Sequence, residues 1–249
     1  MPLYGALEPD RVVSRLPRMA NLDTEAWRLP GVEILQLAWE VGDDSARLLP
    51  RAMHPAVPPY ATVTVARYPA TPVGPFVLAL LRLIGRAGAH PRGLVLGAVA
   101  TSAEAASALR ERWGVPAVPG HVTVRRYHDR MIGTVRVDGE TVLDVALVAP
   151  EVIAAGDVQY IASVTLAEVT EDGQAGVRLV QVDPHYTFHK AERGRPHVDR
   201  FLPDAWNAGG LALVHPISAS LTSVDTDLPQ IRFVMDPEIP VVRGTRRIR

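Results

Sequence analysis

The segment TSAEAASALRERWGVPAV, residues 101–118, carries the clearest helix signal in the chain. Thr101 and Glu104 have the spacing of a capping box, in which a threonine hydroxyl and a glutamate satisfy the first free backbone N–H groups of a helix. Gly114 predicts that the helix ends near Trp113, because glycine accepts the left-handed conformation of a helix end. This helix is the fixed point from which the rest of the chain can be interpreted.

Strand patterns dominate the sequence on both sides of this helix. Apolar alternation and β-branched residues predict strands at 31–41, 61–68, 94–100, 121–127, 131–137, 141–148, 159–169, 176–182, 205–219 and 231–235. Asp138-Gly139 and Glu171-Asp172-Gly173 predict hairpin turns, because glycine accepts the positive φ that such turns need. The sequence also predicts a short helix at 45–49, which Asp43 or Asp44 could cap. A polar loop is expected at 183–200 and a turn at 225–230. Strands joined by tight turns indicate a β-rich α+β fold of antiparallel sheets curled around a core.

The composition is that of a folded protein with no broad affinity for nucleic acid. Hydrophobic residues make up 47% and charged residues 21% of the chain, and the formal net charge is −1. Cysteine is absent, which excludes disulfides, thiolate nucleophiles and cysteine-ligated metals. The N-terminus shows no signal-peptide core, and charged residues interrupt the apolar stretch at 75–100. We therefore expect a cytoplasmic protein that neither binds nucleic acid nor enters a membrane.

The chain is long enough for one large β-rich domain. Prolines punctuate residues 1–30, which are expected to form an irregular lead-in. Residues 31–249 are expected to form a single domain.

Lysine is nearly absent from the sequence. Lys190 is the single lysine among 26 basic residues, and the others are arginine. Arginine keeps its proton near neutral pH and cannot serve as an amine nucleophile. A Schiff-base mechanism would therefore require Lys190 or the α-amine, and the charged run around Lys190 is typical of a solvated loop.

The order of the segments resembles the acetoacetate decarboxylase family. The similarity is carried by Leu48-Leu49-Pro50, the strand at 61–68, Val73-Gly74-Pro75-Phe76, Trp113-Gly114-Val115-Pro116 after the capped helix, and Asp227-Leu228-Pro229. It covers most of residues 31–242. The resemblance implies curled antiparallel sheets in a double β-barrel or cone with a few short helices, a central small-molecule cavity, and a homo-oligomer.

The same resemblance implies that the family's reactive residues are missing. In the family the stretch after the helix reads Gly-aromatic-Pro-Lys-Lys, and its first lysine forms a Schiff base with a β-keto acid. Ala117 and Val118 stand at these positions, and neither can attack a carbonyl. The family's two glutamates correspond to about Val63 and Leu78, and its arginine to about Trp39 or Glu40. The resemblance therefore predicts an apolar cavity without an imine-forming amine.

Glu40, His189 and Arg125 are the catalytic candidates. The carboxyl of Glu40 in an apolar pocket would have a raised pKa and could donate a proton, and His189 could act as a general acid or base. Arg125 could hold a carboxylate or enolate oxygen. Each of these side chains could instead be an ordinary exposed residue. The expected substrate-binding residues are Trp39, Val63, Leu78, Trp113, Ala117 and Val118.

His185, His189 and His197 raise the alternative of a metal site. Their spacing, with Asp183 nearby, could supply ligands for zinc or iron. It matches no specific metal motif, so we expect neither a metal nor another cofactor.

Two main functions remain open. The first is an enzyme that folds a hydrophobic, carbonyl-containing, polyketide-like molecule in the cavity and catalyses cyclisation, including pericyclic closure, isomerisation or dehydration. Orientation within a cavity can supply about 7–11 kcal/mol towards such a ring closure. The second is a non-catalytic small-molecule binding protein on the same scaffold. A β-keto acid decarboxylase that uses Lys190 is the third and weakest hypothesis.

Overall fold

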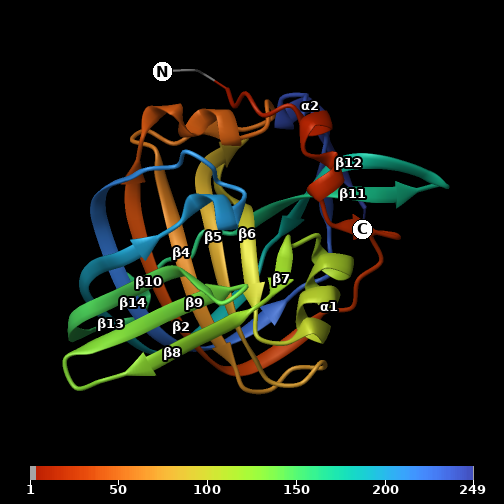
Figure 1. Ribbon diagram of the computed structural model, residues 1–249. Coiled ribbons are helices and arrows are strands. Elements are labelled where there is room, and N and C mark those ends of the chain that lie inside the picture. The colour runs from red at the N-terminus through yellow and green to blue at the C-terminus, as the bar shows by residue number, and fades with distance from the viewer. Residues whose placement is uncertain (1–3, 249) are drawn as a thin grey trace.

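One curled β-sheet organises the chain (Figure 1). The computed structural model describes residues 4–248, and within them sixteen strands form a single sheet. The strands of its first half are β1 (Arg18–Met19), β2 (Trp27–Val41), β3 (His54–Pro55), β4 (Tyr60–Tyr68), β5 (Phe76–Ala87), β6 (His90–Ala100), β7 (Ala117–Pro119) and β8 (His121–Arg126). The strands of its second half are β9 (Arg130–Val137), β10 (Glu140–Ile153), β11 (Ser163–Glu171), β12 (Gln174–Val182), β13 (His185–Phe201), β14 (Leu213–Leu228), β15 (Phe233–Met235) and β16 (Thr245–Arg247).

Helices are few and short. The α-helices are α1 (Ala103–Trp113) and α2 (Val241–Gly244), and the 3-10 helices are η1 (Pro9–Arg11), η2 (Val13–Arg15), η3 (Asp43–Leu48), η4 (Ala155–Asp157) and η5 (Pro203–Trp206). The expected β-rich fold with few short helices is thereby confirmed. Within residues 4–248, none of the helices combines the length and the apolar character needed to cross a membrane.

The strand order brings distant segments side by side. It runs β16-β15-β12-β11-β6-β5-β4-β2-β14-β13-β10-β9-β8, with β1 on β11, β3 on β5 and β7 on β6. The pairs β1–β11, β6–β11 and β6–β7 are parallel, and the other pairs are antiparallel. In Figure 1 the β11–β12 hairpin extends away from the body of the sheet. The middle strands β2, β4 and β5 position the site described below.

The two faces of the sheet bury two apolar cores. Because side chains alternate along a strand, consecutive residues enter different cores. On β4, Val63 and Val65 belong to the larger core, whereas Ala66 packs in the second. Leu109 and Trp113 of α1 also enter the second core, which we call the helix-side core.

Ser102, rather than Thr101, caps α1. The Ser102 hydroxyl accepts the N–H of Ala105 at 3.1 Å and donates to the Glu104 carboxylate at 2.8 Å. Thr101 instead accepts a backbone N–H from β5 at 2.9 Å, because it lies where β6 still runs beside that strand. The helix therefore begins one residue later than the capping-box spacing predicts. It ends as expected at Gly114, whose φ is 62°.

β2 and β13 differ from the sequence prediction. β2 begins at Trp27 rather than at Gly31, so the sheet includes residues that were expected to be irregular. Residues 183–200 were expected to form a polar loop, but most of them belong to β13. That strand is paired on both sides by β10 and β14, which satisfy its backbone groups. Its polar composition arises because alternate side chains are exposed.

Smaller differences lie in β14, η3 and β5. β14 begins only at Leu213 and continues to Leu228, into the turn expected at 225–230. The short helix near residue 45 is 3-10, and neither candidate aspartate caps it with a side-chain hydrogen bond. β5 was not assigned as a strand from the sequence, because its continuous apolar run shows no alternation.

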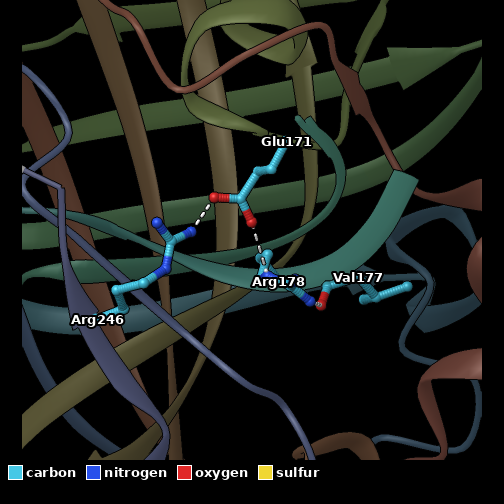
Figure 2. Close-up of polar contacts among 4 residues, drawn as sticks. All are labelled: Glu171, Val177, Arg178 and Arg246. Atoms are coloured by element: carbon cyan, nitrogen blue, oxygen red, sulfur yellow. Dashed lines mark hydrogen bonds and ion pairs between the residues drawn. The ribbon is translucent and has the colours of Figure 1, made fainter. Parts of the chain in front are cut away.

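Glu171 connects the β11–β12 hairpin to the C-terminal strand β16. One carboxylate oxygen accepts from Arg178 Nε at 3.0 Å and the other accepts from Arg246 of β16 (Figure 2). Arg178 also donates to the carbonyl of Val177 at 2.9 Å. Partly exposed ion pairs of this kind contribute about 0.2–1 kcal/mol each, so the contact fixes position more than it adds stability.

Gly97 of β6 allows the backbone of η5 to lie against the sheet. A Cβ at this position would lie 2.8 Å from Trp206 Cα and 2.9 Å from the Trp206 carbonyl oxygen. Because backbone atoms cannot turn aside, we expect Gly97→Ala to lower the free energy of unfolding by about 1–3 kcal/mol in urea denaturation. Gly156→Ala is the matched control, since an added Cβ there meets nothing within 4 Å. Equal effects of the two substitutions would contradict the close approach at Gly97.

Candidate active site

A cavity lies in the helix-side core, between α1 and the face of the sheet. It contains about 800 Å³ of empty space, part of which is open to solvent. Its lining is mainly apolar and includes Leu29, Ile34, Leu78, Leu80, Leu109 and Val182.

A row of polar side chains crosses this apolar lining on adjacent strands. Gln36 of β2 and Thr64 of β4 are direct cross-strand partners, and Arg82 comes from β5. Arg82 Nη2 donates to Gln36 Oε1 at 2.7 Å and to Thr64 Oγ1 at 2.9 Å. Arg82 Nη1 donates to the carbonyl of Ile161 at 3.1 Å and to the hydroxyl of Ser163 at 3.4 Å. The strand order thus surrounds one guanidinium with neutral acceptors.

Arg82 is a buried cation without an acidic partner. It is 5% exposed, and burial lowers its pKa, yet arginine starts so far above neutrality that it stays charged. None of the ion pairs within residues 4–248 includes Arg82. Its Nε–H group also has no hydrogen-bond partner among these residues. Because an uncompensated buried charge is costly, an anionic ligand oxygen would be bound favourably beside this guanidinium.

Three tyrosines supply hydroxyl groups to the same cavity. Tyr68, Tyr160 and Tyr186 belong to its lining, and burial raises the pKa of each phenol. Each phenol therefore remains neutral and keeps its proton at ordinary pH. The Tyr160 hydroxyl lies 2.6 Å from Thr222 Oγ1, and the rings of Tyr160 and Tyr186 meet edge to face at 5.0 Å. A guanidinium with neutral hydroxyl groups is suited to stabilise negative charge on a ligand oxygen.

The cavity lining lacks a group that exchanges a proton near neutral pH. Among the described residues that form it there is no aspartate, glutamate, histidine or lysine. Thr226 adds one more neutral hydroxyl, which is buried and has no hydrogen-bond partner within residues 4–248. These residues can bind and polarise an oxygen, but they include neither a carboxylate or imidazole base nor an amine for an imine.

Leu78 and Trp113 are the predicted site residues that line this cavity. Trp39 and Val63 lie instead in the larger core on the opposite face of the sheet. The physical reason is the period of two along β2 and β4, because an assignment one residue out of register moves a side chain to the other face. The expected pocket with Val63 in its wall is therefore not formed.

The remaining candidates lie outside the cavity lining. Glu40 is half-buried near the end of β2, and Arg125 is exposed on β8. His189 is exposed on β13, where its Nε2 lies 3.0 Å from a carboxylate of β14. Ala117 is buried in the helix-side core without reaching the lining, and Val118 is 39% exposed on β7. The structure does not bring these side chains together around one ligand.

Lys190 is also outside the cavity. It is exposed on β13 and pairs in register with Ser223 of β14. His185 and His197 occupy exposed positions of the same strand. In the part of the chain that the structure describes, no group of three potential metal-ligating side chains is found. The histidines considered for metal binding are therefore not gathered into one site.

Arg82 is the buried charged residue of the cavity lining that the sequence prediction missed. On β5, Leu78, Leu80 and Arg82 are spaced two residues apart, so the arginine shares a face with two leucines of the cavity lining. A lone arginine in phase with apolar residues was a usable signal. Tyr160 and Tyr186 carried no comparable signal, because they reach the cavity through tertiary packing of distant segments.

Comparison with known proteins agrees with this fold. The family model described as acetoacetate decarboxylase (ADC) matches residues 15–236. The chain belongs to the acetoacetate decarboxylase family. No curated protein sequence matches it significantly.

Several solved structures of acetoacetate decarboxylase-like proteins share the fold at low sequence identity. The acetoacetate decarboxylase of Legionella pneumophila is 17% identical, with a TM-score of 0.74 over 84% of this chain and 86% of that one. The enduracididine biosynthesis enzyme MppR, complexed with pyruvate, is 17% identical, with a TM-score of 0.69 over 84% and 90%. An acetoacetate decarboxylase-like enzyme from Sphingomonas wittichii is 16% identical, with a TM-score of 0.66 over 84% and 92%. At these identities the similarity establishes the common fold.

Proposed function

We propose that this chain is an enzyme that binds an apolar molecule through an anionic carbonyl-type oxygen and promotes its cyclisation without forming an imine. The observation that carries the proposal is Arg82, a buried guanidinium whose hydrogen-bond partners are all neutral. A carboxylate or the enolate of a β-dicarbonyl group would supply the missing negative charge. The surrounding apolar lining would hold the rest of the molecule.

Charge and hydrogen bonding favour an oxygen of this kind. A charge-assisted hydrogen bond in a desolvated pocket is stronger than a neutral one. Arg82 and the Tyr160 hydroxyl are held by hydrogen bonds within the protein before the ligand arrives, so little reorganisation is needed when charge develops on that oxygen. Donation to the oxygen also withdraws electrons from an alkene conjugated with it.

Cyclisation fits the lining better than isomerisation or dehydration does. In a pericyclic closure the new bonds form from π electrons of the same molecule, and no proton is lost or gained. Isomerisation and dehydration move protons, and the described lining has no carboxylate or imidazole to carry them. A shaped apolar cavity can instead accelerate closure by holding a flexible chain in a reactive conformation, with about 7–11 kcal/mol available from orientation.

The relatives support small-molecule chemistry of carbonyl compounds on this scaffold. One structure of MppR contains pyruvate, and another contains the condensation product of pyruvate and imidazole 4-carboxaldehyde. MppR is named as an enzyme of enduracididine biosynthesis. A role in the synthesis of a natural product is consistent with this chain's apolar, lysine-free cavity lining.

A linear model compound tests the proposal. It should carry a β-dicarbonyl head, an alkene conjugated with that head, and a distant conjugated diene on the same chain. We expect the purified protein to accelerate formation of the ring product, followed by NMR and mass spectrometry. Binding of the compound without acceleration would support a non-catalytic binding protein instead. Trapping of the compound on Lys190 by borohydride would restore the imine mechanism.

The rate of this closure is expected to vary little between about pH 6 and pH 9. The described lining has no group with an ordinary pKa in that range, and the raised pKa of the phenols keeps them protonated above it. A compound whose head is already ionised at pH 6 removes the ligand's own titration from the profile. A bell-shaped profile that His189→Ala abolishes would contradict this assignment, because His189 lies outside the lining.

A further inference from the structure

We infer that the cavity continues past Val95 into a second apolar pocket, and that the ligand of this site carries a long apolar chain that occupies both. The inference rests on the proposed function, because it places the anionic head of the ligand at Arg82. Val95 of β6 belongs to the lining of both pockets. A ligand with a long apolar chain is a substrate class that the cavity around Arg82 does not by itself require.

The second pocket lies under the N-terminal segment. It contains about 560 Å³ of empty space, including some that is open to solvent. Arg15 and Asn207 are its polar members, and the rest of the lining is apolar, including Leu7, Val12, Leu16, Leu48, Leu94 and Leu166. An apolar lining of this kind suits a hydrocarbon chain better than a polar group.

A break in the sheet separates the two pockets. β6 and β11 are paired only where Gly93 and Leu94 face Ser163 and Val164. β7 joins the same edge of β6 only from Ala98 onward. Between these pairings no strand of residues 4–248 lies beside this edge of β6, so side chains rather than a continuous backbone ladder close the gap.

Asn207 satisfies the backbone at this break. Its Nδ2 donates to the carbonyl of Leu96 at 3.2 Å, which compensates for the absent strand partner. The carbonyl of Leu96 is thus satisfied although no strand pairs with it here.

The elements beside the break contribute to both pockets. On β11, Thr165 lines the first cavity and the next residue, Leu166, lines the second. After α1, Val115 lines the first cavity and the next residue, Pro116, lines the second. The two pockets are therefore back to back at this position, with the side chain of Val95 between them.

Arg82 lies directly at this junction. It is the cross-strand partner of Val95, and the register of β5 and β6 shifts at this point. A ligand whose charged head binds Arg82 would therefore have the junction immediately beside it. An apolar tail that is long enough to pass Val95 would reach the second pocket, whereas a short tail would stay in the first.

Binding of straight-chain carboxylates tests this arrangement without requiring catalysis. Hexanoate, nonanoate and dodecanoate are titrated into the protein by isothermal calorimetry. Each buried methylene should raise the affinity by about fourfold. We expect the gain to continue up to dodecanoate, because the tail extends into the second pocket.

Leu16→Trp provides the decisive variant. Leu16 is half-buried and lines only the second pocket, so the larger side chain should fill that pocket. We expect it to lower dodecanoate affinity by about tenfold or more and to leave hexanoate affinity unchanged. Ser14→Trp is the control, because Ser14 is exposed on η2 and the same ring is added outside the pocket.

The outcomes separate this inference from the proposed function. Equal losses for hexanoate and dodecanoate in Leu16→Trp, or no loss for either, would overturn the two-pocket arrangement. Equal affinity of the unsubstituted protein for all three carboxylates would overturn it as well, while the anion site at Arg82 would stand. Binding of dodecanoate that survives Arg82→Met would overturn both the placement of the head and the extension from it.

Discussion

Arg82→Met is expected to lower the affinity for a carboxylate or enolate ligand, and the rate of ring closure, by at least about a hundredfold. Methionine has a similar length but offers no charge and no N–H group to the ligand oxygen. Removal of a single oxyanion donor in a desolvated site typically costs about 10²–10³ in rate, and loss of a buried charge partner adds to this. Calorimetry with hexanoate and the ring-closure assay measure the two effects separately.

The same substitution is expected to change the free energy of unfolding by less than about 2 kcal/mol. Methionine relieves the cost of burying a guanidinium that has no acidic partner, which favours the folded state. It also removes the donors to Gln36, Thr64 and Ser163, which opposes that gain. Urea denaturation therefore distinguishes a functional role from a structural one. A large loss of stability with unchanged ligand affinity would show that Arg82 serves the fold alone.

Arg86→Met is the matched control for Arg82. It lies on the same strand, β5, but its side chain is exposed and outside the cavity lining. Neither ligand affinity nor stability should change measurably. Arg82→Lys is a second useful variant, because an ammonium keeps the charge but cannot span the acceptors on both sides of the guanidinium. We expect it to retain part of the binding that methionine abolishes.

Local sequence patterns predicted elements well where their signals depend on neighbouring residues. The helix α1, its end at Gly114 and the Asp138-Gly139 hairpin follow from capping and turn chemistry that acts over a few residues. β13 was missed because its backbone is satisfied by β10 and β14, strands that a local pattern does not reveal. Its charged side chains indicated a loop although they lie on a paired strand.

The candidate site shows the same limit more sharply. The family resemblance placed Leu78 and Trp113 at the cavity, but it also suggested Val63, which lies on the opposite face of the sheet from the cavity. The contact among Gln36, Thr64 and Arg82 depends on β2, β4 and β5 being neighbours in register. That arrangement is a property of the sheet as a whole. The sequence pattern could identify a single arginine within an apolar strand, but it could not identify the hydrogen-bond partners of that arginine.

Trp113→Ala is expected to lower the free energy of unfolding by about 3–5 kcal/mol, the typical cost of removing a fully buried large aromatic side chain. Trp113 is buried at the end of α1, where its ring meets the edge of Trp27 at a centroid distance of 4.9 Å. Its Nε1–H donates to the carbonyl of Pro229 at 3.2 Å, and its own carbonyl accepts from Thr165 at 2.7 Å. The side chain thus joins the helix to β2 and to the segment after β14, besides forming part of the cavity wall. Urea denaturation followed by circular dichroism measures the loss.

Two further substitutions, Trp113→Phe and Ser107→Ala, are the controls for Trp113→Ala. Phenylalanine keeps an aromatic ring beside Trp27 but loses the hydrogen bond to Pro229, so we expect a cost of about 1–2 kcal/mol. Ser107 is exposed on the same helix, and its replacement should change stability by less than about 0.5 kcal/mol. If Trp113→Ala were no more destabilising than Ser107→Ala, α1 would not be anchored through this residue. The helix-side wall of the cavity would then be held by Leu109 and the rest of α1 rather than by Trp113.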